Sequence, residues 1–268
     1  MRAVIVTGAA GGMGAEICRS LSREGYKVYG LDCRDFSIDN VINIKCDIRQ
    51  GEDIEAAVSR IRGESDKIYA IVHAAGIYDL DSLVEMDEER FLRIFEINLF
   101  GAYRMTKAVM PLLDEGSRVV IVTSELAPLD PLPFTGIYGM TKAALEKYAF
   151  SLRMELNLLG ISVSVIRPGA VKTGLLGDST RALDRFCENT GIYKCNAERF
   201  KRIVDTVEAR NVPPAKVAKI ALRALHARRP RYVYSLNRNP LLRLLSALPD
   251  RLQVFIIGLI LKQADDNR

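Results

Sequence analysis

The sequence predicts an α/β fold, in which a parallel sheet of about seven strands is doubly wound with helices on both faces. Short runs rich in β-branched residues alternate along the chain with stretches of helical periodicity, which is typical of parallel sheets buried on both faces. The chain has 268 residues, 49% of them hydrophobic, and shows no linker or low-complexity segment, so we expect one domain spanning residues 1–268. The expected strands are Val4–Val6, Val28–Leu31, Val41–Ile44, Ile68–Val72, Val119–Val122, Val163–Ile166 and Arg231–Tyr234.

The first expected strand passes directly into a glycine-rich turn and then into a helical pattern. The glycines of this turn have the spacing G-x-x-x-G-x-G, from Gly8 to Gly14. Small residues before a helix N-terminus let the backbone approach a pyrophosphate and leave amide groups free to bind it. Asp32 ends the second strand eighteen residues after Gly14, where an acceptor for ribose hydroxyls is expected. These features favour a dinucleotide site over an ordinary turn with a surface carboxylate.

Tyr138 and Lys142 open a long apolar-periodic stretch that meets no helix breaker before Gly160. Residues four apart lie on the same face of a helix. A phenol titrates near ~10, and a neighbouring cation lowers that pKa by stabilising the phenolate, at about 1.4 kcal/mol per unit. We therefore expect Lys142 to lower the pKa of Tyr138, although such a pair on its own more often marks a solvated helix face.

Together, the segments Thr7-Gly8-x-x-x-Gly12-x-Gly14 and Tyr138-x-x-x-Lys142 resemble the short-chain dehydrogenase/reductase family. Further matching segments follow in the family's order up to about residue 173. The resemblance implies a Rossmann fold and an NAD(P)(H)-dependent oxidoreductase that interconverts a secondary alcohol and a ketone, or an alcohol and an aldehyde. The catalytic residues it implies are Asn98, Ser124, Tyr138 and Lys142. The cofactor-binding residues it implies are Gly8, Gly11, Gly12, Met13, Gly14, Asp32, Asp47, Ile48, Ala74, Ala75, Gly76, Tyr138, Lys142, Pro168, Gly169, Val171 and Thr173.

The resemblance also implies a role for each catalytic residue. Tyr138 exchanges a proton with the substrate oxygen, and Ser124 donates a hydrogen bond to that oxygen. Lys142 reaches the ribose, and Asn98 holds a water in a proton relay. Asp32 favours NAD(H), because a carboxylate accepts from ribose hydroxyls and repels a 2′-phosphate. Arg34, two residues later, leaves NADP(H) open.

The sequence departs from the family pattern at two positions. His73 stands where the family usually has Asn, and we expect it to be structural. Ser124 lies fourteen residues before Tyr138 instead of thirteen, and Glu125 occupies the usual position of the serine. We favour Ser124 because a hydroxyl can donate to a substrate oxygen, whereas an ionised carboxylate can only accept. An extra residue in the loop 126–133 would account for the shift.

Two segments outside the core pattern are expected to shape the substrate site. An insertion at residues 175–210 is expected to be a helical lid, and an apolar helical extension covers residues 239–262. The run Val254–Leu261 is too short to cross a bilayer, so this extension would be a lid, an oligomer surface or a helix lying on lipid. The architecture is similar to the branch with 17-beta-hydroxysteroid and retinol dehydrogenases, which implies a steroid- or retinoid-like substrate. The apolar residues expected in the lid are Leu175, Leu176, Leu183, Phe186, Ile192, Tyr193 and Phe200.

The distribution of charge and the content of cysteine and histidine limit which partners and metal ions the protein is expected to bind. Nine cations and no acidic residue lie between Glu208 and Asp250. This stretch is either a solvated face or a basic rim for an anionic substrate or a membrane surface, and its lack of exposed aromatics argues against nucleic acid. Two histidines and no C-x-x-C pair give no basis for a metal site.

The remaining expectations concern location, assembly and alternatives. A strand that begins two residues after Met1 leaves no room for a signal peptide, so we expect a cytoplasmic protein. The partners would be an apolar small molecule and further copies of the chain in a homodimer or homotetramer. The alternatives are a sugar-nucleotide epimerase or dehydratase of the extended branch of the family, and a non-catalytic NAD(H)-sensing module.

Overall fold

A seven-stranded parallel sheet forms the centre of the protein in a computed structural model that describes residues 1–208 and 210–262. The strand order is β3-β2-β1-β4-β5-β6-β7. The predicted α/β fold is confirmed, although β4 and β7 begin two residues later than the sequence predicted. The strands are β1 (Ala3–Thr7), β2 (Lys27–Asp32), β3 (Ile42–Lys45), β4 (Ala70–His73), β5 (Arg118–Val122), β6 (Ser162–Pro168) and β7 (Val233–Leu236).

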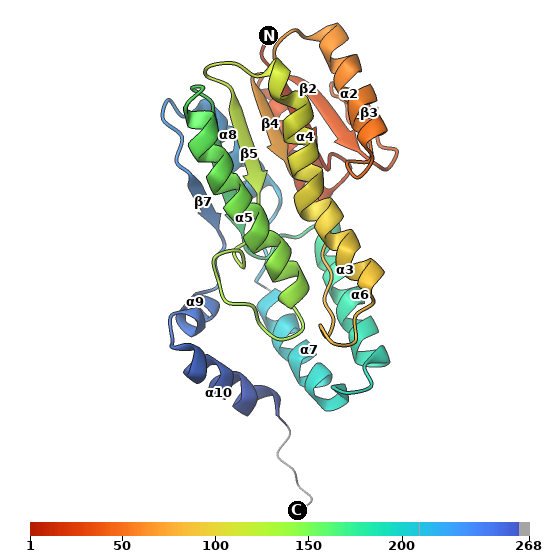
Figure 1. Cartoon of the computed structure of the whole chain (residues 1–268), viewed down its shortest axis with the longest axis vertical. Coiled ribbons are helices and arrows are strands. Elements are labelled where there is room, and N and C mark those ends of the chain that lie inside the picture. Colours follow the sequence, from red (N-terminus) through yellow and green to blue (C-terminus); the bar gives the residue numbers. More distant parts are fainter. Residues whose placement is uncertain (209, 263–268) are drawn as a thin grey trace, which may run out of the picture.

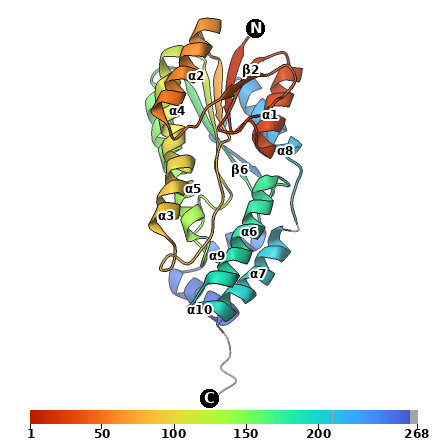
Figure 2. The same ribbon diagram turned by 90° about the vertical axis from the view of Figure 1, so that its right-hand side faces the viewer.

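Helices cover both faces of this sheet, as Figures 1 and 2 show. Successive strand residues point to opposite faces, so Val4 and Val6 pack with α1 and α8, whereas Ile5 packs in the core formed with α2, α4 and α5. The covering helices are α1 (Gly12–Arg23), α2 (Gly51–Glu64), α4 (Gly101–Val109), α5 (Gly136–Asn157) and α8 (Ala215–His226). Both faces of the sheet are therefore buried under helices, as the nearly continuous apolar character of the strand sequences predicted.

The order of strands reverses beside β1, which has β2 on one side and β4 on the other. Thr7 at the end of β1 pairs with Leu31 of β2 and with His73 of β4. In open parallel sheets the connections leave such a reversal in opposite directions, so a crevice opens at the carboxyl ends of the strands. The glycine turn follows Thr7 directly and lies in that crevice.

Most of the remaining helices gather beyond the carboxyl end of the sheet (Figure 1). Leu183, Phe186 and Phe200 of the helix pair α6–α7 pack with Phe134 and with Leu261 of α10 in a separate apolar cluster. No helix in the described ranges is both long and apolar enough to cross a membrane. The elements outside the covering layers are α3 (Glu88–Phe95), the π-helical turn η1 (Glu96–Phe100), the 3-10 turn η2 (Met110–Leu112), α6 (Gly174–Asn189), α7 (Lys194–Glu208), α9 (Pro240–Ser246) and α10 (Asp250–Leu261).

Candidate active site

The glycine turn is packed so closely that side chains would not fit at several positions. Gly8 has φ +74°, and a Cβ there would lie 2.6 Å from the Cα of Ala75. A Cβ at Gly14 would lie 2.0 Å from the carbonyl oxygen of Gly8. Helix α1 begins at Gly12 with no acidic residue in its first turn, and no side chain caps it. Its first amide groups are therefore available to an anion, and the residues present fit a pyrophosphate.

Asp32 lies at the end of β2 and is bonded to this turn. Its Oδ2 accepts from the backbone N–H of Ala10 at 3.0 Å. Its Oδ1 accepts from the backbone N–H and the Nε of Arg34 at 3.0 and 3.2 Å. The carboxylate is 7% exposed, whereas the Arg34 side chain is 64% exposed. The acid is therefore fixed beside the glycine turn, and the arginine that partly neutralises it can turn away.

The next two predicted cofactor residues follow β3. Arg49 binds the Asp47 carboxylate through two nitrogens and holds its pKa below the usual range. Ile48 is buried against Gly101, where a Cβ would lie 2.4 Å from its terminal methyl group. Arg49 thus fixes the orientation of Asp47, and Ile48 joins the core.

Ser124, Tyr138 and Lys142 meet in one cavity of about 200 Å³. Ser124 follows β5, whereas Tyr138 and Lys142 lie on the first turns of α5. Ser124 lies close enough to Tyr138 for its hydroxyl to lower the pKa of the phenol. Lys142 Nζ lies 5.7 Å from the centre of the Tyr138 ring and donates to the carbonyl oxygen of Val122 at 3.3 Å. The helical spacing of the pair thus brings a phenol, an ammonium and a hydroxyl to the same cavity.

The pKa of Tyr138 does not shift in the direction that the sequence suggested. Burial raises it to about 12, and the hydrogen bond from Ser124 opposes that rise. Burial also lowers the pKa of Lys142 to about 8. The expected pKa below the ordinary value is wrong for this structure, because desolvation of the buried phenol is the largest cause of the shift. Tyr138 is consequently a neutral phenol at physiological pH.

Glu125 lines the same cavity but is engaged elsewhere. Its Oε2 accepts from the backbone N–H of Asn239 at 2.6 Å, just before α9. Its Oε1 lies so close to Gly169 that a Cβ at that glycine would be 2.7 Å away. Burial raises the pKa of this carboxyl. Ser124, not Glu125, is thus the neighbour whose side chain lowers the pKa of Tyr138.

Asn98 lies in η1, behind the cavity. Its amide group donates to the Ile77 carbonyl oxygen at 3.0 Å and to Thr141 Oγ1 at 3.1 Å, and its Oδ1 accepts from the Ile77 N–H at 2.8 Å. A Cβ at Gly76 would lie 3.2 Å from that Oδ1 and 3.3 Å from Lys142 Nζ. Gly76 is therefore the point where Asn98 and Lys142 approach each other.

His73 has a structural environment. Its Nε2 shares a hydrogen bond of 2.9 Å with Thr106 Oγ1 of α4, and the ring is 3% exposed. Burial lowers its pKa to about 4, so the ring is neutral. It ties β4 to the helix layer and does not line the cavity.

The segment after β6 closes the crevice opposite the glycine turn. Pro168, Gly169, Val171 and Thr173 all line the cavity, together with Met13 of the turn and with Ala74 and Gly76 after β4. A Cβ at Gly12 would lie 2.7 Å from a methyl carbon of Thr173. Residues predicted from distant segments thus line one cavity. Gly8, Gly14, Ala75 and Asp32 do not line it but belong to the glycine turn or contact it directly.

The predicted lid is a helix pair, but few of its predicted residues face the cavity. Phe200 lines it, Leu183 and Phe186 are buried between the helices, and Ile192 is exposed. The side chains of Leu175 and Leu176 lie outside the described part. The wall is completed by apolar residues that the sequence analysis did not single out, namely Ile77, Leu126, Leu132, Ile203, Val204 and Leu242.

Tyr78 is a further residue at the cavity that no sequence pattern pointed to. Its ring centre lies 4.7 Å from that of Tyr138, at an interplanar angle of 49°. Its position two residues after Gly76 places it in the cavity wall. Because no pattern marks a single aromatic residue in a loop, only the structure reveals this contact.

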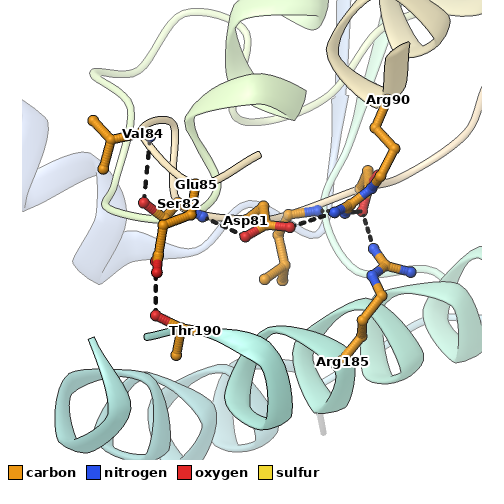
Figure 3. Close-up of polar contacts among 9 residues, drawn as sticks. Asp81, Ser82, Val84, Glu85, Arg90, Arg185 and Thr190 are labelled. Carbon is orange, nitrogen blue, oxygen red and sulfur yellow. Dashed lines mark hydrogen bonds and ion pairs between the residues drawn. The ribbon is translucent and has the colours of Figure 1, made fainter. Parts of the chain in front are cut away.

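Charged residues attach α6 to the loop between β4 and α3, as Figure 3 shows. Arg90 and Arg185 approach this acidic loop from opposite sides, and both bind Asp79. Arg90 also binds Asp81. Glu85 accepts from Thr190 Oγ1 at 2.7 Å and from the backbone N–H groups of Gly191 and Ile192 at 2.8 and 3.1 Å. Polar contacts among the described residues therefore attach the helix pair to this loop at two points, Asp79 and Glu85.

The described residues contain no group of three or more histidines, cysteines or carboxylates that could hold a metal ion. The side chain of Cys195 lies outside the described part. The side chains that meet at the cavity include a phenol, an ammonium and a hydroxyl, which can transfer protons and form hydrogen bonds.

This fold and this site define an NAD(P)-dependent oxidoreductase. The family model described as short chain dehydrogenase matches residues 2–184, so the chain belongs to that family. It is accordingly an enzyme that acts on CH–OH groups with a nicotinamide cofactor.

The relatives agree with this assignment, and a solved structure agrees with the fold. Estradiol 17-beta-dehydrogenase 2 from Mus musculus is 29% identical over 260 residues, covering 87% of this chain and 67% of the relative. A 3-ketodihydrosphingosine reductase from Bacteroides thetaiotaomicron is 25% identical over 264 residues, covering 95% of this chain and 96% of the relative. The fold is similar to that of the aldohexose dehydrogenase from Thermoplasma acidophilum, with a TM-score of 0.73 at 22% identity over 88% of this chain and 93% of that one.

Proposed function

We propose that the protein interconverts a lipophilic ketone and the corresponding secondary alcohol, with a steroid- or other lipid-like substrate. The observation that carries the proposal is the single cavity in which Ser124, Tyr138 and Lys142 meet a wall of mostly apolar side chains. An apolar wall binds an apolar substrate by excluding water, and few polar groups remain to orient it. Two relatives carry names of lipid-like substrates, estradiol and 3-ketodihydrosphingosine, which supports this substrate class.

In the proposed mechanism Tyr138 is the proton donor to the carbonyl oxygen. Its raised pKa keeps the phenol protonated at neutral pH, as a general acid in ketone reduction must be. Ser124 donates to the same oxygen and fixes its position beside the phenol. Hydride transfer to or from the reacting carbon is the chemistry that a nicotinamide cofactor would supply when bound in the crevice.

Lys142 and Asn98 have supporting roles in this proposal. A pKa of about 8 leaves Lys142 mostly charged at neutral pH, so its ammonium stabilises negative charge that develops on Tyr138. Asn98 and Lys142 both border Gly76, and a water there would return a proton to the tyrosine. The assigned cofactor residues would hold the dinucleotide. Asp32 favours NAD(H), and the exposed Arg34 can serve NADP(H).

We also infer that the chain forms a homodimer or a homotetramer through the outer face of α4 and α5. Phe100, Tyr103, Phe150 and Met154 are 42% to 62% exposed on neighbouring elements of that face. Contiguous exposed apolar residues mark association surfaces in water. Sedimentation velocity on wild type and on a Phe150→Ser, Met154→Ser double variant tests this face: the variant is expected to be monomeric.

The experiment that tests the function is a screen of NADH and NADPH oxidation against apolar ketones, aldehydes and quinones, with Tyr138→Phe as the reference variant. We expect turnover with an apolar ketone, and a loss of about 10²–10⁴-fold in the Phe variant with NADH binding nearly unchanged. Tyr78→Phe is the matched control, because it removes a phenol hydroxyl from the same cavity wall and leaves the proposed donor in place. A Tyr138→Phe enzyme that retained a tenth of the wild-type turnover would exclude the assigned role.

A further inference from the structure

Helices α9 and α10 expose an unusual amount of apolar surface at the substrate end of the molecule. They lie beyond the sheet, beside α7, in both Figures 1 and 2. The exposed apolar residues of the two helices are between 42% and 72% accessible. This set, called the C-terminal apolar face, consists of Leu241, Leu244, Leu252, Val254, Phe255, Leu259 and Ile260.

Helix α10 buries only a narrow stripe against the body of the protein. Gln253 and Leu261 are buried, and Ile257 packs partly against the cluster between α6 and α7. Phe255, Leu259 and their neighbours occupy the rest of the circumference. Water is a poor environment for a helix that is apolar nearly all round, so this face needs a second, apolar medium.

Charges around the C-terminal apolar face indicate which medium covers it. Arg243, Arg251 and Lys262 are exposed along α9 and at both ends of α10, whereas Asp250 is the single acid between residues 238 and 262. Arginine and lysine beside an apolar helix face are attracted to anionic lipid headgroups, while the apolar side chains enter the boundary of the acyl chains. A symmetric contact with a second copy would instead bring the same arginines towards each other, which is unfavourable.

We infer that the C-terminal apolar face docks the enzyme on the surface of an anionic lipid bilayer, with α9 and α10 lying in the interface. The docked face borders the cavity, because Leu242 of α9 lines the cavity wall while Leu241 and Leu244 on the same helix are exposed. An apolar substrate dissolved in the bilayer then meets the cavity without crossing water. This last consequence rests on the proposed function, whereas the docking itself does not.

The test is co-sedimentation of the full chain with vesicles of phosphatidylcholine alone and of phosphatidylcholine mixed with phosphatidylglycerol. We expect wild type to bind the mixed vesicles more tightly, and a Phe255→Ser, Leu259→Ser double variant to bind at least about tenfold more weakly, since each lost apolar side chain contributes to insertion. Arg243→Ser with Arg251→Ser should remove the preference for mixed vesicles. Leu158→Ser with Leu159→Ser is the matched control, because these exposed leucines follow α5 and lie outside the proposed docking face; it should bind like wild type.

Far-UV circular dichroism and an NADH titration establish that each variant is folded, and Leu241→Ser with Leu244→Ser on α9 replaces the α10 pair if that pair does not fold. Wild type that ignores both kinds of vesicle would overturn the inference. So would an α10 variant that binds vesicles like wild type, and in particular one that elutes as a smaller assembly in size exclusion, because a second copy would then cover the face. None of these readouts needs turnover, so the docking can fail while the proposed reaction stands.

Discussion

The two ends of the active-site crevice are built in different ways. At the cofactor end, backbone meets backbone: added Cβ atoms would lie 2.6 Å from Ala75 at Gly8 and 2.0 Å from the Gly8 carbonyl oxygen at Gly14. At the substrate end, side chains bridge a gap, with Arg185 bound to Asp79 and Glu85 bound to the turn between α6 and α7. A close contact between backbone atoms leaves no room for an added atom. An attachment made by several polar contacts can lose one of them and still hold the helices in place.

This difference divides the crevice into two halves. We call the cofactor end, with its close backbone contacts, the fixed half, and the substrate end, with its side-chain attachments, the adjustable half. Salt bridges between partly exposed side chains contribute about 0–1 kcal/mol each, so the attachments of α6 are individually weak. Close backbone contacts instead belong to the packed core, where adding even one methyl group changes the stability. We therefore expect substitutions at the glycine turn to act on folding and cofactor binding, and substitutions at the lid to act on substrate binding.

The strongest test of the fixed half is Gly14→Ala. The new methyl group would overlap the Gly8 carbonyl group, which belongs to backbone and cannot swing away. We expect loss of NADH binding and a marked drop in the free energy of unfolding, measured by fluorescence titration and urea denaturation. Gly63→Ala in α2 is the matched control, because nothing lies within 4 Å of the added atom; it should bind NADH normally and change stability by no more than about 1 kcal/mol. A Gly14→Ala protein with wild-type NADH affinity would show that the turn is not fixed.

The second test lies where the two halves meet, at Ser124 and Glu125. Ser124→Ala removes the hydroxyl that lowers the pKa of Tyr138 and should lower kcat by about 10²–10³-fold, as loss of an oxyanion donor does. Glu125→Gln keeps an oxygen that can accept from Asn239, so it should retain a kcat near wild type. Steady-state kinetics on both folded variants decide the matter. If the Gln variant is the more damaged one, the glutamate and not the serine serves the reacting oxygen.

Sequence reasoning reached further in the fixed half than in the adjustable half, for a physical reason. The glycine turn and the strands are local sequence patterns. The order of the family's motifs predicted that Ser124 and Tyr138 belong to one site, and both line the same cavity. The pKa of Tyr138 could not be predicted, because desolvation depends on every neighbour that excludes water. The bond between Arg185 and Asp79 joins residues 106 positions apart, and no short-range pattern predicts such a pair. The sequence therefore predicted more of the cofactor end of the crevice than of the contacts that hold the lid.

The third test asks whether the carboxylate at the end of β2 selects the cofactor. A carboxylate near a 2′-phosphate repels it by on the order of a few kcal/mol at contact distance and an effective dielectric near 20, and pairing with Arg34 reduces this. Wild type should therefore prefer NADH over NADPH in kcat/KM, and Asp32→Asn should narrow or reverse the preference. Asp35→Asn is the matched control, since that acid pairs with Lys45 on the surface. A wild-type preference for NADPH would mean that Arg34 governs this end of the crevice.

The smallest effect is expected in the adjustable half, from Glu85→Gln. Glu85 accepts from Thr190 Oγ1 and from two backbone N–H groups of the turn between α6 and α7, and these bonds hold its pKa below the usual range. A glutamine keeps one acceptor oxygen but turns an NH₂ group towards donors, so the turn is released at one of its two attachment points. We expect KM for the ketone to rise several-fold while kcat and NADH affinity stay close to wild type, because the released helix pair carries Phe200 of the cavity wall and none of the proton-transfer groups. Glu88→Gln, at the exposed start of α3, is the matched control and should leave KM unchanged. A fall in kcat with unchanged KM would instead make the lid part of the fixed half, and the contrast between the two ends of the crevice would be wrong.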